Sequence, residues 1–317
     1  MEPTNTNKTK ADIYYIDNIN PQDLYEEYIK KDKVVILKNV VKDWPAATLT
    51  LEMLQENFGD KKLRIRAGDR LNWKTLCRVK MKDYINFIRG AHDISPLDQW
   101  KNLNPYAAFN VVEGIDASVD FHSLMPDTFT HTPTILWLGP KHSLTPLHYD
   151  DSGHTFLAQI HGRKRFILYP YHETPNLYPS DLFDFMSVFS EVNIDNPDYA
   201  RHPKFKQAKS IEVILNPGEI IVIPMRMWHQ VEALDESLSF SCRSAEYTLP
   251  VKARHLGWYA KALLHLSNLY KQERCLCHIV PWDEDDLKIH HPVVKFLARH
   301  GGLKFHGKDL ADIVGWR

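Results

Sequence analysis

Short apolar segments separated by turns dominate the chain between residues 134 and 247. Residues 134–138 and 144–150 have the composition of extended segments, and residues 156–170 contain two apolar runs around Gly162. Residues 219–224 form a continuous apolar run with the length of a buried strand. Many short strands of this kind predict two antiparallel sheets that close on each other as a jelly roll.

Apolar residues recur at helical spacing on both sides of this predicted core. From residue 251 onwards the spacing predicts a C-terminal helical region over 251–317, whereas residues 1–10 are polar and predict a disordered tail. The main domain is therefore expected over 11–250. Its N-terminal elements are expected to pack outside the core, as helices over 21–31, 51–58 and 81–89 and strands over 34–37 and 63–66.

Residues 171–210 are long for a connection between two core strands, and long insertions in compact domains are often functional. Their aromatic residues allow two interpretations: they cover the mouth of a site or contact a substrate, or they form a small satellite core. These residues are Tyr178, Phe183, Phe185 and Phe189.

The composition is that of a globular protein without a strong charge bias. The 317 residues carry a formal net charge of -1, and 44% of them are hydrophobic. This charge gives no indication of a nucleic-acid partner, and no apolar run approaches the about 18 residues of a membrane helix. The polar start lacks the apolar segment of a secretory signal, and the 4 cysteines are too few and too irregular for a disulfide framework. We therefore expect a soluble protein without a membrane partner in a reducing compartment, the cytoplasm and/or the nucleus.

The most informative motif is His148-Tyr149-Asp150, followed much later by His229. Residues i and i+2 of a strand point to the same face, so His148 and Asp150 are able to bind one ion while Tyr149 points away. The strand at 219–224 is expected to deliver His229 just past its end. Two imidazoles and one carboxylate form the facial triad of non-haem Fe(II) oxygenases, although Mn, Co and Ni are compatible with the same ligands. Chance pairs occur in a chain with 17 histidines, so the further motifs also matter.

A lysine enters the second apolar run after the carboxylate of the triad. A buried site that holds a dicarboxylate needs a fixed cation facing the metal, and Lys164 is the candidate. Adjacent strand residues face opposite ways, so Arg165 is expected to point away from the site.

Several spaced motifs occur in a consistent order. They are 145–150, the turn Gln159-Ile-x-Gly162-x-Lys164, 193–199, and the segment from 217–219 to Trp228-His229. Together they resemble the JmjC-domain 2-oxoglutarate oxygenases, and within these the small hydroxylase branch typified by the asparaginyl hydroxylase that represses hypoxia-inducible factor. The resemblance covers about residues 10–250. It implies a cupin or JmjC catalytic domain, a double-stranded β-helix with its core at about 134–247.

The resemblance also implies a set of site residues. Fe(II) would be bound by His148, Asp150 and His229, with 2-oxoglutarate and O2 as co-substrates. Thr145 and Lys164 would bind the distal carboxylate of 2-oxoglutarate. Tyr106 falls where the family often places a tyrosine on that same carboxylate.

Two positions depart from the family pattern. The family usually has an asparagine a few residues after the carboxylate ligand, but here the stretch 151–155 is one residue longer. That places Thr155, or else His154, in the role of contacting the co-substrate. On the late strand, where the hydroxylases commonly carry a second asparagine, this chain offers Ser241 or Arg243.

The implied activity is hydroxylation of a protein side chain, coupled to decarboxylation of 2-oxoglutarate to succinate. Two other enzymatic activities are the alternatives, N-methyl-lysine demethylation and tRNA modification. Demethylation is disfavoured because this chain has His-x-Asp, whereas demethylases commonly carry His-x-Glu. The non-enzymatic alternative is a catalytically silent JmjC scaffold, and the intact set of metal ligands argues against it. Related hydroxylases use C-terminal helices as a homodimer interface, so the apolar helical stripe after residue 251 is either such an interface or intrachain packing.

Overall fold

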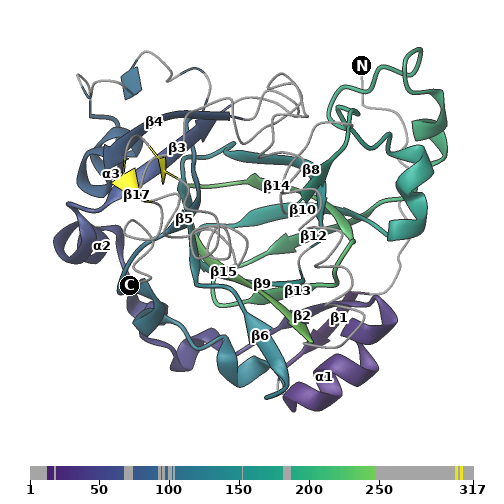
Figure 1. Ribbon diagram of the computed structural model, residues 1–317, viewed down its shortest axis with the longest axis horizontal. Coiled ribbons are helices and arrows are strands. Elements are labelled where there is room, and N and C mark those ends of the chain that lie inside the picture. The colour runs from purple at the N-terminus through teal and green to yellow at the C-terminus, as the bar shows by residue number, and fades with distance from the viewer. Residues whose placement is uncertain are drawn as a thin grey trace. The chain divides into compact units, whose positions relative to one another are not determined.

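The computed structural model describes residues 13–246 apart from short gaps, and two short strands further along the chain (Figure 1). The gaps are residues 18, 68–73, 92–93, 95–96, 99–101, 103, 152 and 181–186. The chain divides into two compact units, of which the first comprises 1–182 and 186–247. The helices predicted over 251–317 lie outside the described residues. Within that range the structure describes only the antiparallel pair Lys304–Phe305 (β16) and Lys308–Asp309 (β17).

Two sheets make up most of the first unit. The larger contains Ile13–Ile16 (β1), Val34–Leu37 (β2), Ala107–Val111 (β5), Phe129–His131 (β6), Ile135–Gly139 (β7), His154–His161 (β9), Ile220–Ile223 (β13) and Ser237–Glu246 (β15). The smaller contains Leu144–Asp150 (β8), Lys164–Tyr169 (β10), Ser187–Phe189 (β11), Ile211–Leu215 (β12) and Trp228–Ala233 (β14). Their orders are β1-β2-β13-β9-β15-β7-β5, with β6 beside β15, and β11-β8-β14-β10-β12 (Figure 1). The mainly β, jelly-roll prediction is confirmed.

The strands β2 and β13 of the larger sheet are buried on both faces. Every residue of β2 and β13 is buried, which explains why their sequences are continuously apolar rather than alternating. One face packs on the inward face of the smaller sheet and forms the core between the sheets. That core consists of Val34, Ile36, Leu157, Phe166, Leu168, Ile211, Val213, Leu215, Ile221, Ile223, Met227 and Val231.

Three short helices contribute buried residues to the core on the other face of the larger sheet. Asn20 and Thr50 cap two of them, each accepting a backbone N–H with its side-chain oxygen. Leu24, Leu54 and Ile85 anchor the helices there. The helices are Pro21–Glu27 (α1), Leu51–Phe58 (α2) and Met81–Ile88 (α3), and the 3-10 turns are Ile29–Lys31, Val41–Asp43, Pro45–Thr48, Ile115–Ser118, His122–Leu124, Tyr171–Asn176 and Pro203–Gln207. Among the described residues, no helix has the length and apolar character needed to cross a membrane.

The N-terminal strands differ from the prediction that they pack outside the core. β1 pairs in parallel with β2, and β2 pairs with β13, so both extend the larger sheet. The physical reason is that a lone β2 would leave the backbone N–H and C=O groups along its edges unpaired and two apolar faces uncovered, and membership of the sheet satisfies both. A separate hairpin is formed by Lys62–Ala67 (β3) and Lys74–Lys80 (β4).

Residues 171–210 supply much of a satellite core that packs against the smaller sheet. This core contains Leu147, Tyr169, Leu177, Val192, Phe205 and Trp228. Tyr178 packs against it, whereas Phe189 on β11 stacks on the ring of His148. The insertion therefore contributes to a satellite core, and through Phe189 it also contacts a predicted metal ligand. The two other aromatic residues, Phe183 and Phe185, lie outside the described residues.

The turn that leads into β10 depends on Gly162. Its φ of 68° is left-handed, and a Cβ added there would lie 2.0 Å from the carbonyl oxygen of Glu236. The buried amide of Gln159 donates to the carbonyl oxygens of His161 at 2.7 Å and Gly162 at 2.9 Å. Together these contacts fix the residue at which β10 begins.

We expect Gly162→Ala to lower the melting temperature clearly. The left-handed backbone costs an L-residue about 1–2 kcal/mol, and the contact with backbone of Glu236 adds a clash that no side chain can relieve. Gly218→Ala is the matched control, since its φ is 86° but a Cβ there meets no atom within 4 Å. Thermal unfolding of both variants checks this, and an equal loss in the two would contradict the role assigned to the clash.

Candidate metal centre

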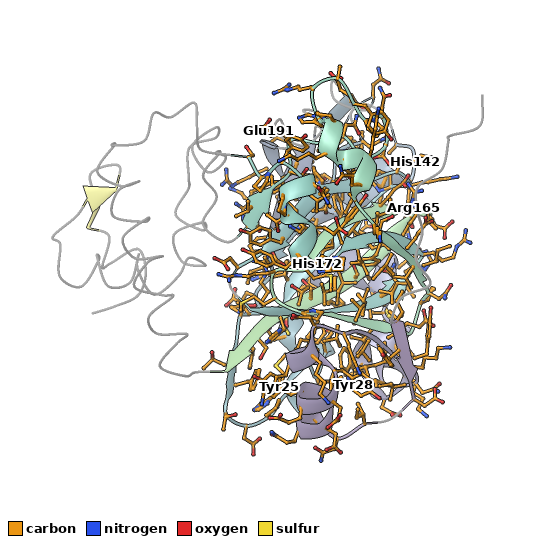
Figure 2. All side chains as sticks on the ribbon, turned by 90° about the vertical axis from the view of Figure 1, so that its right-hand side faces the viewer. Tyr25, Tyr28, His142, Arg165, His172 and Glu191 are labelled. Atoms are coloured by element: carbon orange, nitrogen blue, oxygen red, sulfur yellow. The ribbon has the colours of Figure 1, made fainter. Side chains whose placement is uncertain are left out.

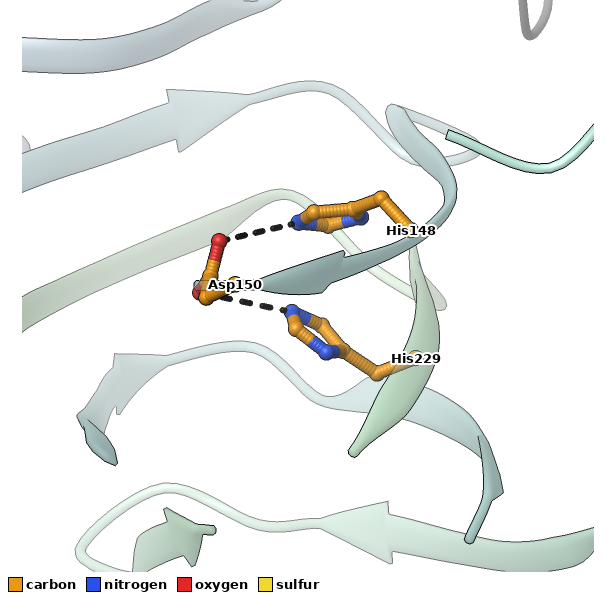
Figure 3. A group of neighbouring side chains, drawn as sticks. All are labelled: His148, Asp150 and His229. Atoms are coloured by element: carbon orange, nitrogen blue, oxygen red, sulfur yellow. Dashed lines mark ion pairs between the residues drawn. The ribbon is translucent and has the colours of Figure 1, made fainter. Parts of the chain in front are cut away.

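Three ligand-type side chains converge between the two sheets. His148 and Asp150 stand on β8, and His229 stands on β14 directly opposite His148. One donor atom from each lies within 4.8 Å of the others, and all three residues are buried (Figure 3). His229 was expected just past the end of β13, but it belongs to a strand of the other sheet, because the chain turns at Pro224 after β13.

Each imidazole is oriented by a backbone carbonyl. Nδ1 of His148 lies 2.7 Å from the oxygen of Pro146, and Nδ1 of His229 lies 2.9 Å from that of Met227. Because Nδ1 donates in both, Nε2 carries the lone pair, and it faces Asp150 at 3.8 Å and 3.9 Å (Figure 3), beyond hydrogen-bond length. Burial lowers the pKa of His148 to about 3 and also lowers the pKa of His229. Both rings are therefore neutral near pH 7, the form that binds metals.

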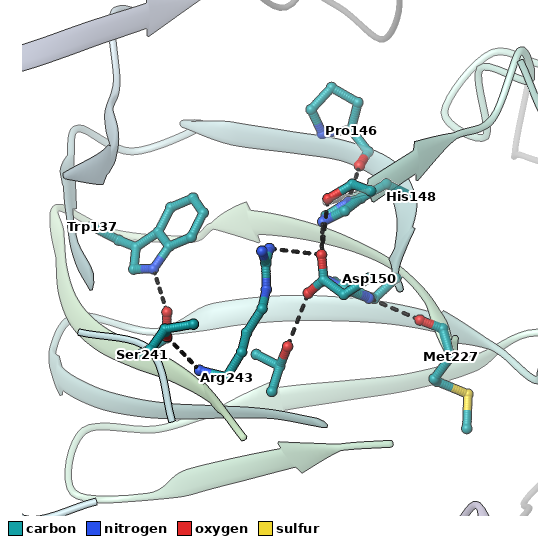
Figure 4. Close-up of polar contacts among 11 residues, drawn as sticks. Trp137, Pro146, His148, Asp150, Met227, Ser241 and Arg243 are labelled. Carbon is teal, nitrogen blue, oxygen red and sulfur yellow. Dashed lines mark hydrogen bonds and ion pairs between the residues drawn. The ribbon is translucent and has the colours of Figure 1, made fainter. Parts of the chain in front are cut away.

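Asp150 is held as a carboxylate by three donors. Thr155 donates to Oδ2 at 2.9 Å, whereas Ser187 at 2.9 Å and Arg243 at 2.7 Å donate to Oδ1 (Figure 4). Burial opposes the charge, but Arg243 and the two histidines outweigh it and hold the pKa of Asp150 well below its usual value. An ionised carboxylate has about four lone-pair sites, so one is left. Two neutral imidazoles and this carboxylate fit a divalent metal such as Fe(II).

A β-bulge places Thr145 on the face that carries His148. Thr145 lies three positions before His148, so regular alternation would point the two to opposite faces. Their partners His229 and Val231 are only two residues apart, which shows that β8 holds an extra residue near Pro146. Pro146 has no N–H to lose from the ladder, and its carbonyl accepts from His148. The buried Thr145 consequently lies in the site.

Lys164 is a buried cation without a charged partner among the described residues. The residue is 1% exposed, and Nζ donates to the hydroxyls of Tyr106 at 3.1 Å and Ser239 at 2.5 Å. Burial lowers its pKa to about 7. A buried charge without a counter-charge is costly, so this position favours an anionic ligand.

Arg165 points the other way. The side chain of Arg165 is 31% exposed (Figure 2), and its Nη2 lies 2.6 Å from a carboxylate oxygen of Glu232. Glu232 also contacts His142.

The remaining predicted residues lie around the same space, each with a protein partner. The ring of Tyr106 passes Gly139 so closely that an added Cβ would lie 2.6 Å from it. Ser241 accepts from Nε1 of Trp137 at 2.8 Å (Figure 4). Thr155 contacts the carboxylate of Asp150 rather than standing free for a co-substrate.

Three contacts of the site were missed by the sequence reasoning. Ser187 binds Asp150, Phe189 stacks on His148 with ring centres 5.2 Å apart, and Ser239 binds Lys164. The first two stand on a three-residue strand, which is too short for a recognisable period. Ser239 had a signal, because it alternates with Ser241 and Arg243 on one face of β15.

Comparison with known proteins agrees with this geometry. A family model described as a cupin-like domain matches residues 21–242. The chain is 28% identical over 240 residues to HSPB1-associated protein 1 of Bos taurus, covering 70% of this chain and 50% of that protein. It is 30% identical over 226 residues to lysine-specific demethylase 8 of Xenopus tropicalis, covering 68% and 49%. JmjC domain-containing protein D of Dictyostelium discoideum is 48% identical over 103 residues, covering 32% and 23%.

The chain spans about half the length of the first two relatives, so the matches describe a shared domain. The matched segment 21–242 includes both ligand strands and all three donors of the candidate metal centre. The chain therefore belongs to the family of cupin-like domains of the JmjC type.

Proposed function

We propose that this chain is an Fe(II)- and 2-oxoglutarate-dependent oxygenase that hydroxylates a protein side chain. JmjC-type cupins typically use this metal and co-substrate, and the donor set fits the metal. The observation that carries the proposal is the buried metal-ligand group together with Lys164, a buried cation without a charged partner among the described residues. The metal-ligand group and Lys164 together suit a ligand that chelates a metal at one end and carries a carboxylate at the other.

The metal would be held by His148, Asp150 and His229. When bound, Fe(II) supplies open coordination positions for O2 and the 2-oxo acid, and with them the oxidising chemistry. The protein contributes orientation, because both imidazoles are fixed by carbonyl oxygens before any metal arrives. It also contributes burial, which excludes water from the reacting groups.

The far end of 2-oxoglutarate would be held by Lys164 and Thr145. Tyr106 and Ser239 fix the ammonium of Lys164, so its position does not depend on the ligand. Thr145 stands on the inward face through its bulge and offers a hydroxyl.

A protein substrate is supported by the name of one relative, HSPB1-associated protein 1, and the formal net charge of -1 gives no support for RNA. Demethylation is the second candidate, because another relative is named lysine-specific demethylase 8. The narrower resemblance to the asparaginyl hydroxylases adds weight to hydroxylation. The intact ligand set argues against a silent scaffold.

Succinate formation from 2-oxoglutarate by the Fe(II)-loaded protein tests the oxygenase proposal. Mass spectrometry of candidate protein substrates then separates the two activities, since hydroxylation adds one oxygen atom and demethylation removes a methyl group. The His148→Ala protein is the matched blank. A wild-type protein that binds neither Fe(II) nor 2-oxoglutarate would contradict the proposal.

Affinity for 2-oxoglutarate is expected to fall as the pH rises above about 7. Burial lowers the pKa of Lys164 to about 7, so the free protein loses this charge through that pH while the carboxylate requires it. A bound carboxylate would raise the pKa, and binding at pH 8 should therefore take up a proton. Calorimetry in buffers of different ionisation enthalpy measures this uptake. Lys164→Arg, which stays charged, should abolish it, and equal uptake in both proteins would contradict the assignment.

We also propose a homodimer formed through the helices predicted over 251–317. If their apolar stripe is an interface, removing residues 251–317 should expose it or separate the subunits. Light scattering of the intact and shortened proteins measures the molecular mass. A monomeric intact protein at micromolar concentration would favour intrachain packing instead.

A further inference from the structure

Arg243 is a second buried cation beside the candidate metal centre. The residue is 6% exposed, and from β15 its Nη2 donates to Oδ1 of Asp150 at 2.7 Å (Figure 4). Its Nη1 is buried and has no hydrogen-bond partner among the described residues. A buried charged group rarely leaves a donor unused, so a ligand is expected to take this one.

The guanidinium is held on a second side by Phe109, whose ring centre lies 5.3 Å from Cζ of Arg243. Phe109 has a φ of 57°, which is rare for an aromatic residue, and it lies in a bulge of β5. Asn110 clamps this bulge through two hydrogen bonds with the backbone of Arg64, at 2.7 Å and 3.0 Å. Strained backbone of this kind persists where the surrounding structure enforces it, often at ligand sites.

The charges of the pocket also call for an anion near Arg243. Among the described residues the two cations are Lys164 and Arg243, and Asp150 is the carboxylate between the sheets. A divalent metal bound at His148, Asp150 and His229 would add to this positive charge. A ligand with a carboxylate at each end would offset most of it.

We propose that Arg243 binds the carboxylate at the metal-chelating end of the 2-oxo acid, through Nη1, while Lys164 binds the carboxylate at the far end. The inference rests on the proposed function. One face of β15 carries Ser239, Ser241 and Arg243. Ser239 contacts Lys164 and Arg243 contacts Asp150, so this face of the strand spans the distance between the two groups. In consequence, Arg243 recognises any 2-oxo acid, whereas Lys164 selects those with a second carboxylate.

A merely structural Arg243 would behave differently. If it only supported Asp150, its loss would weaken metal binding. If it binds the carboxylate of a 2-oxo acid, its loss should weaken 2-oxo acid binding by protein that is still loaded with metal.

The test uses Mn(II)-loaded protein, so that ligand binding is measured without turnover. Calorimetric titrations compare two ligands, 2-oxoglutarate and 2-oxobutyrate, and the latter lacks the second carboxylate. We expect Arg243→Gln to weaken both ligands by about 10- to 100-fold, the range for a charge-assisted hydrogen bond. Lys164→Ala should weaken 2-oxoglutarate alone. Arg243→Lys keeps the charge and should restore part of the affinity.

Arg226→Gln is the matched control, because Arg226 pairs with the neighbouring Asp151 at 2.7 Å and its side chain is 32% exposed. It should change neither affinity. Arg243→Gln protein that binds both acids as wild type does, or that loses Mn(II) affinity instead, would overturn the inference. Wild-type protein that binds Mn(II) but no 2-oxo acid would overturn the proposed function itself, which is a separate result.

Discussion

Replacing His148 by alanine is expected to remove stoichiometric metal binding and, with it, turnover of 2-oxoglutarate. The change deletes one of three protein donors, so the loss should exceed the ~10–100-fold that is typical when a partner behind a ligand is removed. The fold should survive, because the core between the sheets is built from other, apolar side chains. Metal analysis of the purified protein and titration with Co(II) measure the effect.

His142→Ala is the control for this prediction. His142 contacts Glu232 on the outer face of the smaller sheet, with a side chain that is 58% exposed (Figure 2), so its loss should leave metal binding unchanged. Asp150→Ala is a poorer test, since it also leaves Arg243 buried without its ion pair, which costs about 3–5 kcal/mol of stability. A His148→Ala protein that still binds one metal ion per chain would refute the assigned ligand set.

Replacing Lys164 by alanine is expected to weaken 2-oxoglutarate binding about 10- to 100-fold while metal binding stays nearly unchanged. A charge-assisted hydrogen bond contributes about 1.5–3 kcal/mol, and about 1.4 kcal/mol corresponds to a tenfold change. Nζ of Lys164 contacts Tyr106 and Ser239 but none of the metal ligands, which is why the two affinities should separate. Calorimetric titration of the Mn(II)-loaded protein measures both.

Arg165→Ala is the matched control, because Arg165 is the next residue of the same strand and pairs with Glu232 on the opposite face. The pair is partly exposed at the surface, where ion pairs contribute about 0–1 kcal/mol to stability, and no co-substrate contact is lost. A larger effect on affinity from Arg165 than from Lys164 would show that β10 presents the other face to the site.

The elements predicted most accurately are those fixed by local pattern. α2 has the bounds that its apolar spacing indicated, and β8 has those of its extended segment. The sheet to which each strand belongs was harder to predict from the sequence. β2 joined the larger sheet and His229 fell on β14, because pairing partners are set by contacts far apart in the sequence, on which local periodicity carries no information.

Thr145 shows the limit of the two-residue period most clearly. Alternation along β8 places it opposite to His148, and only the family resemblance pointed to it as a site residue. The bulge near Pro146 resolves the conflict by adding one residue to β8 against β14. Phe109 is a second example, since the residues around it in the sequence do not predict a left-handed backbone conformation at an aromatic residue.

The sequence by itself determined the chemistry of the metal ligands, because the spacing of His148 and Asp150 converts directly into a shared face of one strand. Only the tertiary structure decided what surrounds them. Arg243 reaches Asp150 across 93 residues, and Phe189 reaches His148 through a strand of an insertion. Those contacts depend on how two sheets align face to face, and that alignment is set by the packing of the whole apolar core rather than by any local run of residues.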